Sequence, residues 1–286
     1  MKGWGLKSFI IFISLGISYI FAYDPSHLKL KNTKPTELDG MEVVNKLGST
    51  VPLDLTFFDE TGKQISLGSL FSLGKPVVLS MVYYRCPTLC SYHLNGIVKV
   101  FKELDWNLGE KYEFIAVSID PTESNDLASK KRDAYQKDYT SSGNFRLSSG
   151  MHFLTGTKEN IKLLADSSGF PYKYNPISQQ WVHPAVAYIL TPDGKISRVF
   201  NGISFEERDL KLSLVEATGG KIGTIMDQVV LFCFQFDPNK NKYTIYAYNM
   251  MRIGGGFTVF FIAGYLFTFW RKNKNNNITN YPTGGV

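Results

Sequence analysis

The sequence has almost no surplus of charge outside its two ends. Its formal charge is +6, but five of those charges come from end segments without any acidic residue, at Lys2, Lys7, Arg271, Lys272 and Lys274. Of the 31 basic residues, 26 lie in residues 8–270 together with all 25 acidic ones, a balance of +1. Nucleic-acid binding rests mainly on Lys and Arg side chains that neutralise phosphates. We therefore expect no nucleic-acid partner.

Cysteine is scarce too, with three in 286 residues, and no internal repeat is visible. Two of the three, Cys86 and Cys90, lie four residues apart, directly after the apolar run of residues 76–84. A chain of this length holds one sizeable domain plus attachments. The search for chemistry therefore starts at this cysteine pair.

Two apolar stretches, one near each end, are candidates for export or membrane insertion. Residues 1–22 join a basic start to an apolar run, which is typical of a signal peptide, and an uncleaved anchor is the alternative. Residues 253–270 are uncharged and follow Arg252, so we expect a transmembrane helix over residues 252–270, with a buried core helix as the alternative. The tail of residues 271–286 has three basic residues and no acidic one, which predicts a cytoplasmic location.

The two ends predict the side of the membrane on which the domain lies. A cleaved signal leaves one membrane span, and an uncleaved anchor leaves two. Both models place the domain outside the cytoplasm, tethered to the cell membrane on its periplasmic side. Cysteines there meet an oxidising compartment.

Apolar patterns predict an α/β domain over residues 47–218, between a linker (23–46) and a juxtamembrane segment (219–251). A hairpin is expected first, and strands and helices then alternate, which implies right-handed crossovers and a mostly parallel centre. The expected hairpins cover residues 53–67 and 185–200, the second with a turn at 192–194, and the expected strands cover residues 76–84, 112–119 and 145–155. The expected helices cover residues 88–104, 124–138, 157–168 and 206–217.

The cysteine pair is expected at the turn from a strand into a helix. A helix N-terminus carries unpaired N–H groups and a partial positive charge, which favour thiolate over thiol. Pro87 fits the first helical turn, where its missing N–H costs nothing. Residues four apart on a helix have side chains about 5–6 Å apart, close enough for a disulfide. The pair can therefore close a disulfide or hold a soft metal.

A metal site needs further ligands, and two histidines are candidates. His93 lies three residues after Cys90 and seven after Cys86, so all three fit one helical face. His183 precedes Pro184, which favours extended backbone ahead of a strand. Spacing alone does not choose between the two histidines.

Four segments occur in order between residues 53 and 205: YYRCPTLC at residues 83–90, VSIDP at 117–121, HFLTG at 152–156, and His183 followed by PDG at 192–194. Together they resemble the SCO1/SenC family of copper chaperones for cytochrome c oxidase. The resemblance implies a thioredoxin-like fold with an N-terminal hairpin and an inserted hairpin. It also implies that Cys86, Cys90 and His183 bind one copper ion, Cu(I) or Cu(II), and that His93 lies on the helix surface.

The resemblance leaves one further position open. Asp120 matches the family's Asp-Pro and is a candidate for a supporting role beside the metal. Alternatively, Asp120, Pro121 and Glu123 are an N-cap, a first-turn proline and a capping-box acid. Val182 also stands where many members have an acidic residue before the histidine.

Cys233 lies outside the part of the chain that carries the resemblance. We expect a buried, inert thiol among aromatic neighbours. An auxiliary thiol for metal transfer and an intermolecular disulfide are the alternatives.

The resemblance implies a membrane-tethered chaperone that delivers copper to the CuA centre of cytochrome c oxidase. Its partners would be the CuA-bearing oxidase subunit, other periplasmic copper carriers or thiol reductants, and the membrane. One alternative is an enzyme, either a thiol-disulfide oxidoreductase that reduces the oxidase's copper-ligand cysteines or a peroxiredoxin-like peroxidase. Such an enzyme needs Cys86 and Cys90 but has no evident use for His183. A third hypothesis, a structural disulfide in a binding module, predicts no metal.

Overall fold

The structure, a computed structural model, describes residues 40–86, 88–141, 150–219, 231, 234–237, 240 and 242–278. The predicted signal or anchor and most of the predicted linker lie outside these residues. So do Pro87, Cys233 and the last part of the tail.

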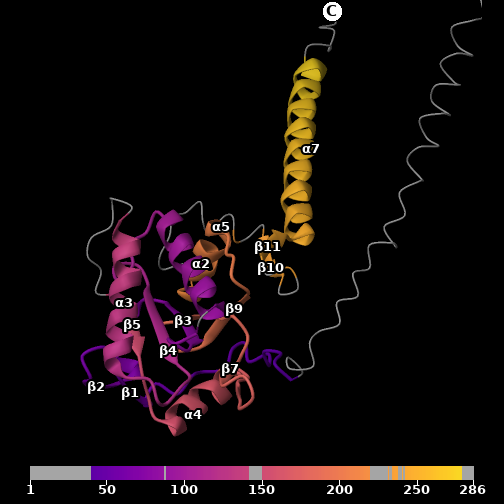
Figure 1. Cartoon of the computed structure of the whole chain (residues 1–286). Coiled ribbons are helices and arrows are strands. Elements are labelled where there is room, and N and C mark those ends of the chain that lie inside the picture. Colours follow the sequence, from indigo (N-terminus) through magenta and orange to yellow (C-terminus); the bar gives the residue numbers. More distant parts are fainter. Residues whose placement is uncertain are drawn as a thin grey trace, which may run out of the picture. The chain divides into compact units, whose positions relative to one another are not determined.

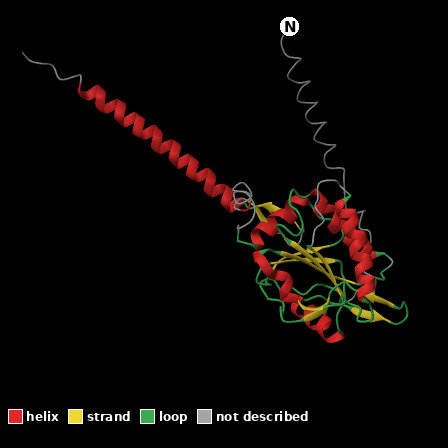
Figure 2. Ribbon diagram, turned by 90° about the vertical axis from the view of Figure 1, so that its left-hand side faces the viewer, coloured by secondary structure: helices red, strands yellow, loops and turns green. Residues whose placement is uncertain are grey.

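A five-stranded sheet in the order β5-β4-β3-β8-β9 forms the centre of the domain. Its strands are β3 (Val77–Val82), β4 (Glu113–Ser118), β5 (Met151–Leu154), β8 (Val186–Leu190) and β9 (Ile196–Asn201). Strands β3, β4 and β8 are buried along their whole length, as their continuous apolar runs predict. Figure 2 shows the sheet at the centre of the domain with helices around it.

The expectation of a mostly parallel centre is right for only half of the sheet. β3 runs parallel to β4, and β4 to β5, but β8 pairs antiparallel with both β3 and β9. The reason lies in the connections, because antiparallel neighbours need no helical crossover. A tight turn with Gly194 at φ 80° joins β8 to β9.

Helices follow the strands as the apolar periodicity predicts. They are α2 (Leu89–Glu103), α3 (Asn125–Thr140), α4 (Lys158–Ser168) and α5 (Glu207–Ala217). α2 contacts both α3 and α5, and Figure 1 shows it between them. Its buried residues include Leu94, Ile97 and Phe101, one face at helical spacing. With the mixed sheet, these helices make the fold thioredoxin-like.

Three small hairpins and a 3-10 helix, η3 (Leu67–Gly74), complete the domain. The predicted N-terminal hairpin is β1 (Thr56–Phe58) with β2 (Gln64–Ser66). The inserted hairpin, which the resemblance implied without a position, is β6 (Lys173–Asn175) with β7 (Gln180–Val182). The sequence did not predict β10 (Phe234–Asp237) with β11 (Lys242–Ile245). β10 and β11 pack on the domain through Phe236, whose ring lies 5.2 Å from that of Phe200, and through the Tyr243 N–H, which donates to Asp209.

The last described element is the helix α7 (Ala247–Ile278). Within it, Met251–Arg271 is long and apolar enough to cross a membrane, and none of this stretch is buried. The alternative of a buried core helix therefore has no support in the described part of the chain.

Candidate metal centre

A buried carboxylate holds the loop that carries the cysteines. Glu123, only 5% exposed, accepts hydrogen bonds from the backbone N–H groups of Tyr84 at 2.8 Å and Arg85 at 2.7 Å. It also accepts one from the Ser118 hydroxyl at 2.6 Å. The loop between β3 and α2 is thereby tied to the end of β4.

This arrangement corrects the capping prediction. Helix α3 begins at Asn125, and its N-cap is Ser124, which accepts a hydrogen bond from the Leu127 N–H. Glu123 therefore lies before the N-cap, and its carboxylate binds the loop between β3 and α2 instead of the start of α3. Sequence reasoning missed this role, because a local acid at a helix start gives no sign of a partner 39 residues away.

Cys86 and Cys90 are both buried free thiols, at 7% and 2% exposure. Cys90 lies in the first turn of α2, and its backbone N–H donates to the Cys86 sulfur at 3.3 Å. A hydrogen bond with the Cys90 side chain lowers the pKa of Cys86, and the backbone N–H groups of Cys90 and Thr88 add to this effect. The same side-chain bond and burial raise the pKa of Cys90. The pair thus holds one thiolate and one thiol.

The inserted hairpin brings His183 to this pair. His183 follows β7 directly, and its Nε2 lies 3.0 Å from the Cys90 sulfur although 93 residues separate them in the chain. The Nδ1 atom lies 2.8 Å from the Pro184 carbonyl oxygen, which can only accept, so Nδ1 carries the proton. Burial lowers the pKa of His183. The ring is therefore neutral, and its Nε2 lone pair faces the sulfur.

Aromatic side chains surround this histidine. The Tyr83 ring meets the imidazole edge-on at 5.8 Å between centroids, and the Phe170 ring lies at the same distance. The Tyr83 hydroxyl also hydrogen-bonds the Cys86 thiolate. Burial raises the pKa of Tyr83, as does its bond to Cys86, so the hydroxyl stays a donor.

Cys86, Cys90 and His183 are thus linked in a row, and their donor atoms fit a soft metal. Among the described residues, however, no three His, Cys, Asp or Glu side chains already form a metal-binding cluster. Two thiol sulfurs and one neutral imidazole nitrogen are a donor set that suits copper.

His93, the other histidine considered as a metal ligand, is buried and does not lie on the helix surface. It is 1% exposed, its Nδ1 lies 2.8 Å from the Gly202 carbonyl oxygen, and its Nε2 lies 2.8 Å from the Ser80 hydroxyl. The prediction of a surface residue is wrong, because the 202–205 loop covers this side of α2. Both ring nitrogens have protein partners, which leaves no lone pair for a metal.

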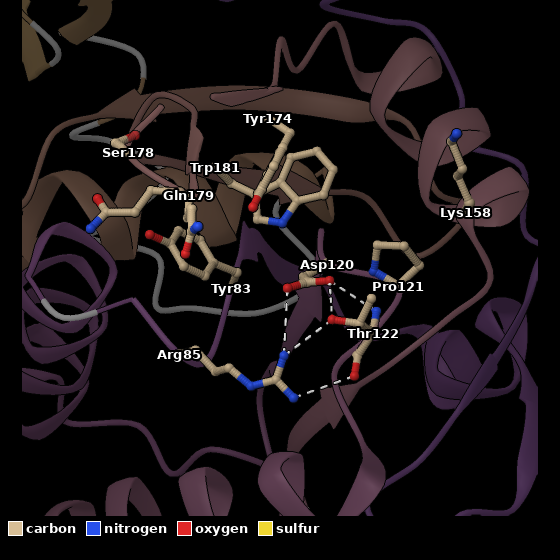
Figure 3. Close-up of a pocket in the computed structure, with 11 residues that line it drawn as sticks. Tyr83, Arg85, Asp120, Pro121, Thr122, Lys158, Tyr174, Ser178, Gln179 and Trp181 are labelled. Carbon is tan, nitrogen blue, oxygen red and sulfur yellow. Dashed lines mark hydrogen bonds and ion pairs between the residues drawn. The ribbon is translucent and has the colours of Figure 1, made fainter. Parts of the chain in front are cut away.

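Asp120 lies at the edge of a neighbouring cavity of about 800 Å³. Its carboxylate accepts hydrogen bonds from the N–H and hydroxyl of Thr122, and it lies 3.7 Å from the Arg85 guanidinium. Figure 3 shows Arg85 directed toward Asp120 and Thr122 on one side of the cavity, with Tyr83 and Trp181 also lining it. The structure thus brings Asp120 to Arg85, the residue before Cys86, and a supporting role near the metal stays a prediction.

Comparisons with known proteins bear on the fold and the family. No curated protein sequence matches the chain. A crystal structure of a protein from Aquifex aeolicus VF5, described as a candidate electron transfer protein, has 24% identity and a TM-score of 0.53 over 61% of this chain and 96% of that one. Arabidopsis thaliana ScoI with copper bound has 20% identity and a TM-score of 0.45, over 57% and 94% of the two chains. Bradyrhizobium japonicum ScoI with copper bound has 24% identity and a TM-score of 0.41, over 58% of this chain and 96% of that one.

The family itself follows from the sequence match. At 24% identity, the likeness to the Aquifex protein concerns the fold alone, and it agrees with a thioredoxin-like domain. The SCO1/SenC family model matches residues 47–215, which is more than half of the chain. The chain therefore belongs to the SCO1/SenC family.

Proposed function

We propose that this protein is a membrane-tethered copper chaperone that binds one copper ion through Cys86, Cys90 and His183 and delivers it to the CuA centre of cytochrome c oxidase. The observation that carries the proposal is the 3.0 Å contact between Cys90 and His183. A structural or redox disulfide has no need of a neutral imidazole aimed at one of its sulfurs. Membership of the SCO1/SenC family and the copper bound in the Arabidopsis and Bradyrhizobium structures agree with this choice of metal.

The donor set suits a cargo that has to be released. Thiolates are soft ligands that select Cu(I), and imidazole accepts both Cu(I) and Cu(II). Three protein ligands leave a position at which an acceptor can share the ion before the donor releases it. Metal binding requires the reduced pair, since a Cys86–Cys90 disulfide has no thiolate to offer. Loading is thereby coupled to the redox state of the two cysteines.

Burial of the three side chains adds a requirement to this transfer. Each is less than 10% exposed, and the Tyr83 and Phe170 rings pack around His183. An acceptor therefore reaches the ion only after a covering side chain moves. The β6–β7 hairpin, which leads into His183, is the element whose displacement would open the site.

The membrane tether is assigned to α7. The stretch Met251–Arg271 has the length and composition of a membrane span. Basic residues follow it, so we assign the tail to the cytoplasm and the domain to the periplasmic side. Labelling of single cysteines introduced at Ser69 and Thr279 with a membrane-impermeant reagent in intact cells tests this orientation; labelling only at position 279 would reverse it.

Copper titration tests the ligand assignment. The reduced full-length protein in detergent is titrated with Cu(I) against a competing chelator, alongside Cys86→Ser and His183→Ala. We expect one ion per chain for the wild type and none for Cys86→Ser. His183→Ala should bind more weakly by about tenfold or more, since even groups that merely orient a ligand are worth that much. Equal affinities of wild type and His183→Ala would refute the assignment of the histidine.

A thiol-disulfide oxidoreductase remains the second candidate, because the Cys86 thiolate is stabilised by N–H groups at a helix N-terminus. This activity requires both cysteines but not His183. The test is reduction of a disulfide-containing CuA-domain peptide by the wild type and His183→Ala, with hydrogen peroxide as a separate substrate for a peroxidase. Equal, rapid peptide reduction by both proteins, together with absent copper binding, would favour the oxidoreductase over the chaperone.

A further inference from the structure

The ring of His93 connects three segments of the domain core. Its Nδ1–H donates to the Gly202 carbonyl oxygen at 2.8 Å, and its Nε2 lies 2.8 Å from the oxygen of the Ser80 hydroxyl, which also contacts the Val186 carbonyl oxygen at 3.0 Å. The same Nε2 lies 3.2 Å from the Val186 carbonyl oxygen. One imidazole ring therefore joins helix α2 to the loop after β9, the middle of β3 and the start of β8.

These contacts lead from one proposed copper ligand to another. His93 lies one helical turn after Cys90 on α2. Gly202, which accepts from His93, donates its own N–H to the Ala185 carbonyl oxygen at 2.8 Å. Ala185 is two residues after His183. A short series of hydrogen bonds thus runs from the helix that holds Cys90 to the segment that holds His183.

The 202–205 loop also packs closely against α2. At Gly96, one turn beyond His93, a Cβ atom would lie only 2.0 Å from the Ile203 carbonyl oxygen. The Phe205 ring meets the His93 ring edge-on at 5.7 Å. The loop therefore has little freedom to shift along the helix, and the hydrogen bond from His93 to Gly202 has a fixed length and direction.

We propose that His93 is a positioning residue of the metal centre, which sets the separation between Cys90 on α2 and His183 ahead of β8 through Gly202 and Ala185. This inference rests on the proposed function and assigns it a further residue. His93 itself does not touch the ion, because both of its ring nitrogens are held by the protein. It acts on the ion only through His183.

A double-mutant cycle tests this indirect action. Cu(I) affinity of the reduced full-length protein is measured for the wild type, His93→Phe, His183→Ala and the double variant. Phe keeps the ring and its packing but has no hydrogen-bonding nitrogen. We expect His93→Phe to weaken binding by about tenfold. The double variant should bind no more weakly than His183→Ala alone, because His93 has no ligand left to position. Wild-type affinity in His93→Phe, or losses that multiply in the double variant, would overturn the proposal.

Two further variants separate positioning from general loss of stability. Leu164→Ala empties a buried site on α4, so it destabilises the domain without touching the His93 contacts. We expect it to keep wild-type copper affinity. Ser80→Ala removes one partner of the ring and is the milder variant should His93→Phe not fold. It should weaken binding in the wild-type background and have no effect in the His183→Ala background, and an equal effect in both backgrounds would contradict the proposal.

A readout without copper separates this inference from the proposed function. In the reduced metal-free protein, ring ¹⁵N shifts report which nitrogen of His183 carries the proton. We expect the Nδ1–H form in the wild type and in Leu164→Ala, and a mixture of both forms in His93→Phe. An unchanged His183 ring in His93→Phe would overturn the positioning role. A wild-type protein that binds no copper but shows this NMR difference would refute the chaperone assignment alone.

Discussion

The surroundings of His93 and His183 are two buried regions that differ in what the imidazole meets. Both rings are about 5% exposed or less, and burial lowers the pKa of both. Around His93, a carbonyl oxygen and a hydroxyl occupy the two ring nitrogens. Around His183, a carbonyl oxygen takes Nδ1, and a sulfur atom faces Nε2.

Burial and neutrality are common to both rings, so neither property distinguishes the proposed ligand His183 from His93. A metal needs a lone pair whose hydrogen-bonding partner can itself lose its proton and become a ligand, as the Cys90 thiol can and the Ser80 hydroxyl cannot. Proximity in the sequence is equally uninformative, since His93 is the histidine close to the cysteine pair and His183 is 93 residues from Cys90. What separates the two rings is the chemistry of the partner at Nε2.

The most severe test of this contrast removes the sulfur that faces His183. Cys90→Ser should abolish Cu(I) binding, because a hydroxyl is a poor ligand for a soft ion. The surroundings of His93 should be unaffected, so the free energy of unfolding should change by about 1 kcal/mol at most. Chelator competition and urea denaturation measure the two quantities, with Cys233→Ser as the control that keeps full binding. Retained binding by Cys90→Ser would remove the basis of the contrast.

Replacing each histidine by alanine should separate stability from metal binding. His93→Ala loses two hydrogen bonds and leaves a cavity in the core, which should lower the free energy of unfolding by about 3 kcal/mol. His183→Ala loses its contacts with the Pro184 carbonyl oxygen and the Cys90 sulfur, of which only the second joins distant segments, and should cost less, about 2 kcal/mol. Urea denaturation of the metal-free, reduced proteins at pH 7.5 gives both values. A larger loss for His183→Ala would show that His183, too, is mainly a structural residue.

A single methyl group on α2 tests how tightly the 202–205 loop is held against His93. In Gly96→Ala the new Cβ would meet the Ile203 carbonyl oxygen, so the loop or the helix has to shift. We expect a loss of about 2 kcal/mol, beyond the small gain in helix propensity. Thermal unfolding measures it, and Asn95→Ala, at an exposed neighbouring position, should change stability by less than about 0.5 kcal/mol. Equal melting temperatures for the two variants would mean that the loop yields easily.

Acid should destabilise the domain partly through His93. Burial lowers the pKa of His93 from 6.5 to about 4. Between these values the unfolded chain binds a proton that the folded chain does not, so stability falls as the pH falls through this window. His93→Phe should flatten that slope by at most about 1.4 kcal/mol per pH unit. Urea denaturation at several pH values from 6.5 to 4.5 checks this, and an unchanged slope would show that the folded protein protonates His93 normally.

Most of the fold was predictable because its signals are local. Continuous apolar runs mark the buried strands β3, β4 and β8, and apolar residues at helical spacing mark the buried face of α2. Both patterns can be seen in the sequence without knowing the rest of the fold. The inserted hairpin β6–β7 could not be placed from the sequence, because its strands have three residues each and no fully buried position. The sheet was expected to be mostly parallel, because the alternation of strand and helix does not show that the predicted hairpin of residues 185–200 joins β3 through an antiparallel strand.

The site was predictable only in part. Cys86 and Cys90 were proposed from their spacing, whereas His183 was proposed from the family resemblance, since its contact with Cys90 depends on how β8 pairs with β3. His93 was expected on the surface because nothing in α2 reveals the loop that covers it. Glu123 was assigned to a cap because the sequence does not show that its carboxylate reaches back to the loop before Cys86.

The separation of 93 residues between Cys90 and His183 also sets an order of events during synthesis. The chain is made from its N-terminus, so the two thiols exist well before the imidazole does. A contact of such long range forms only after β8 has joined the sheet. Until then the nascent chain can close a disulfide but cannot bring the three proposed copper ligands together. Under the proposed function, a disulfide closed in this interval has to be reduced before copper is loaded.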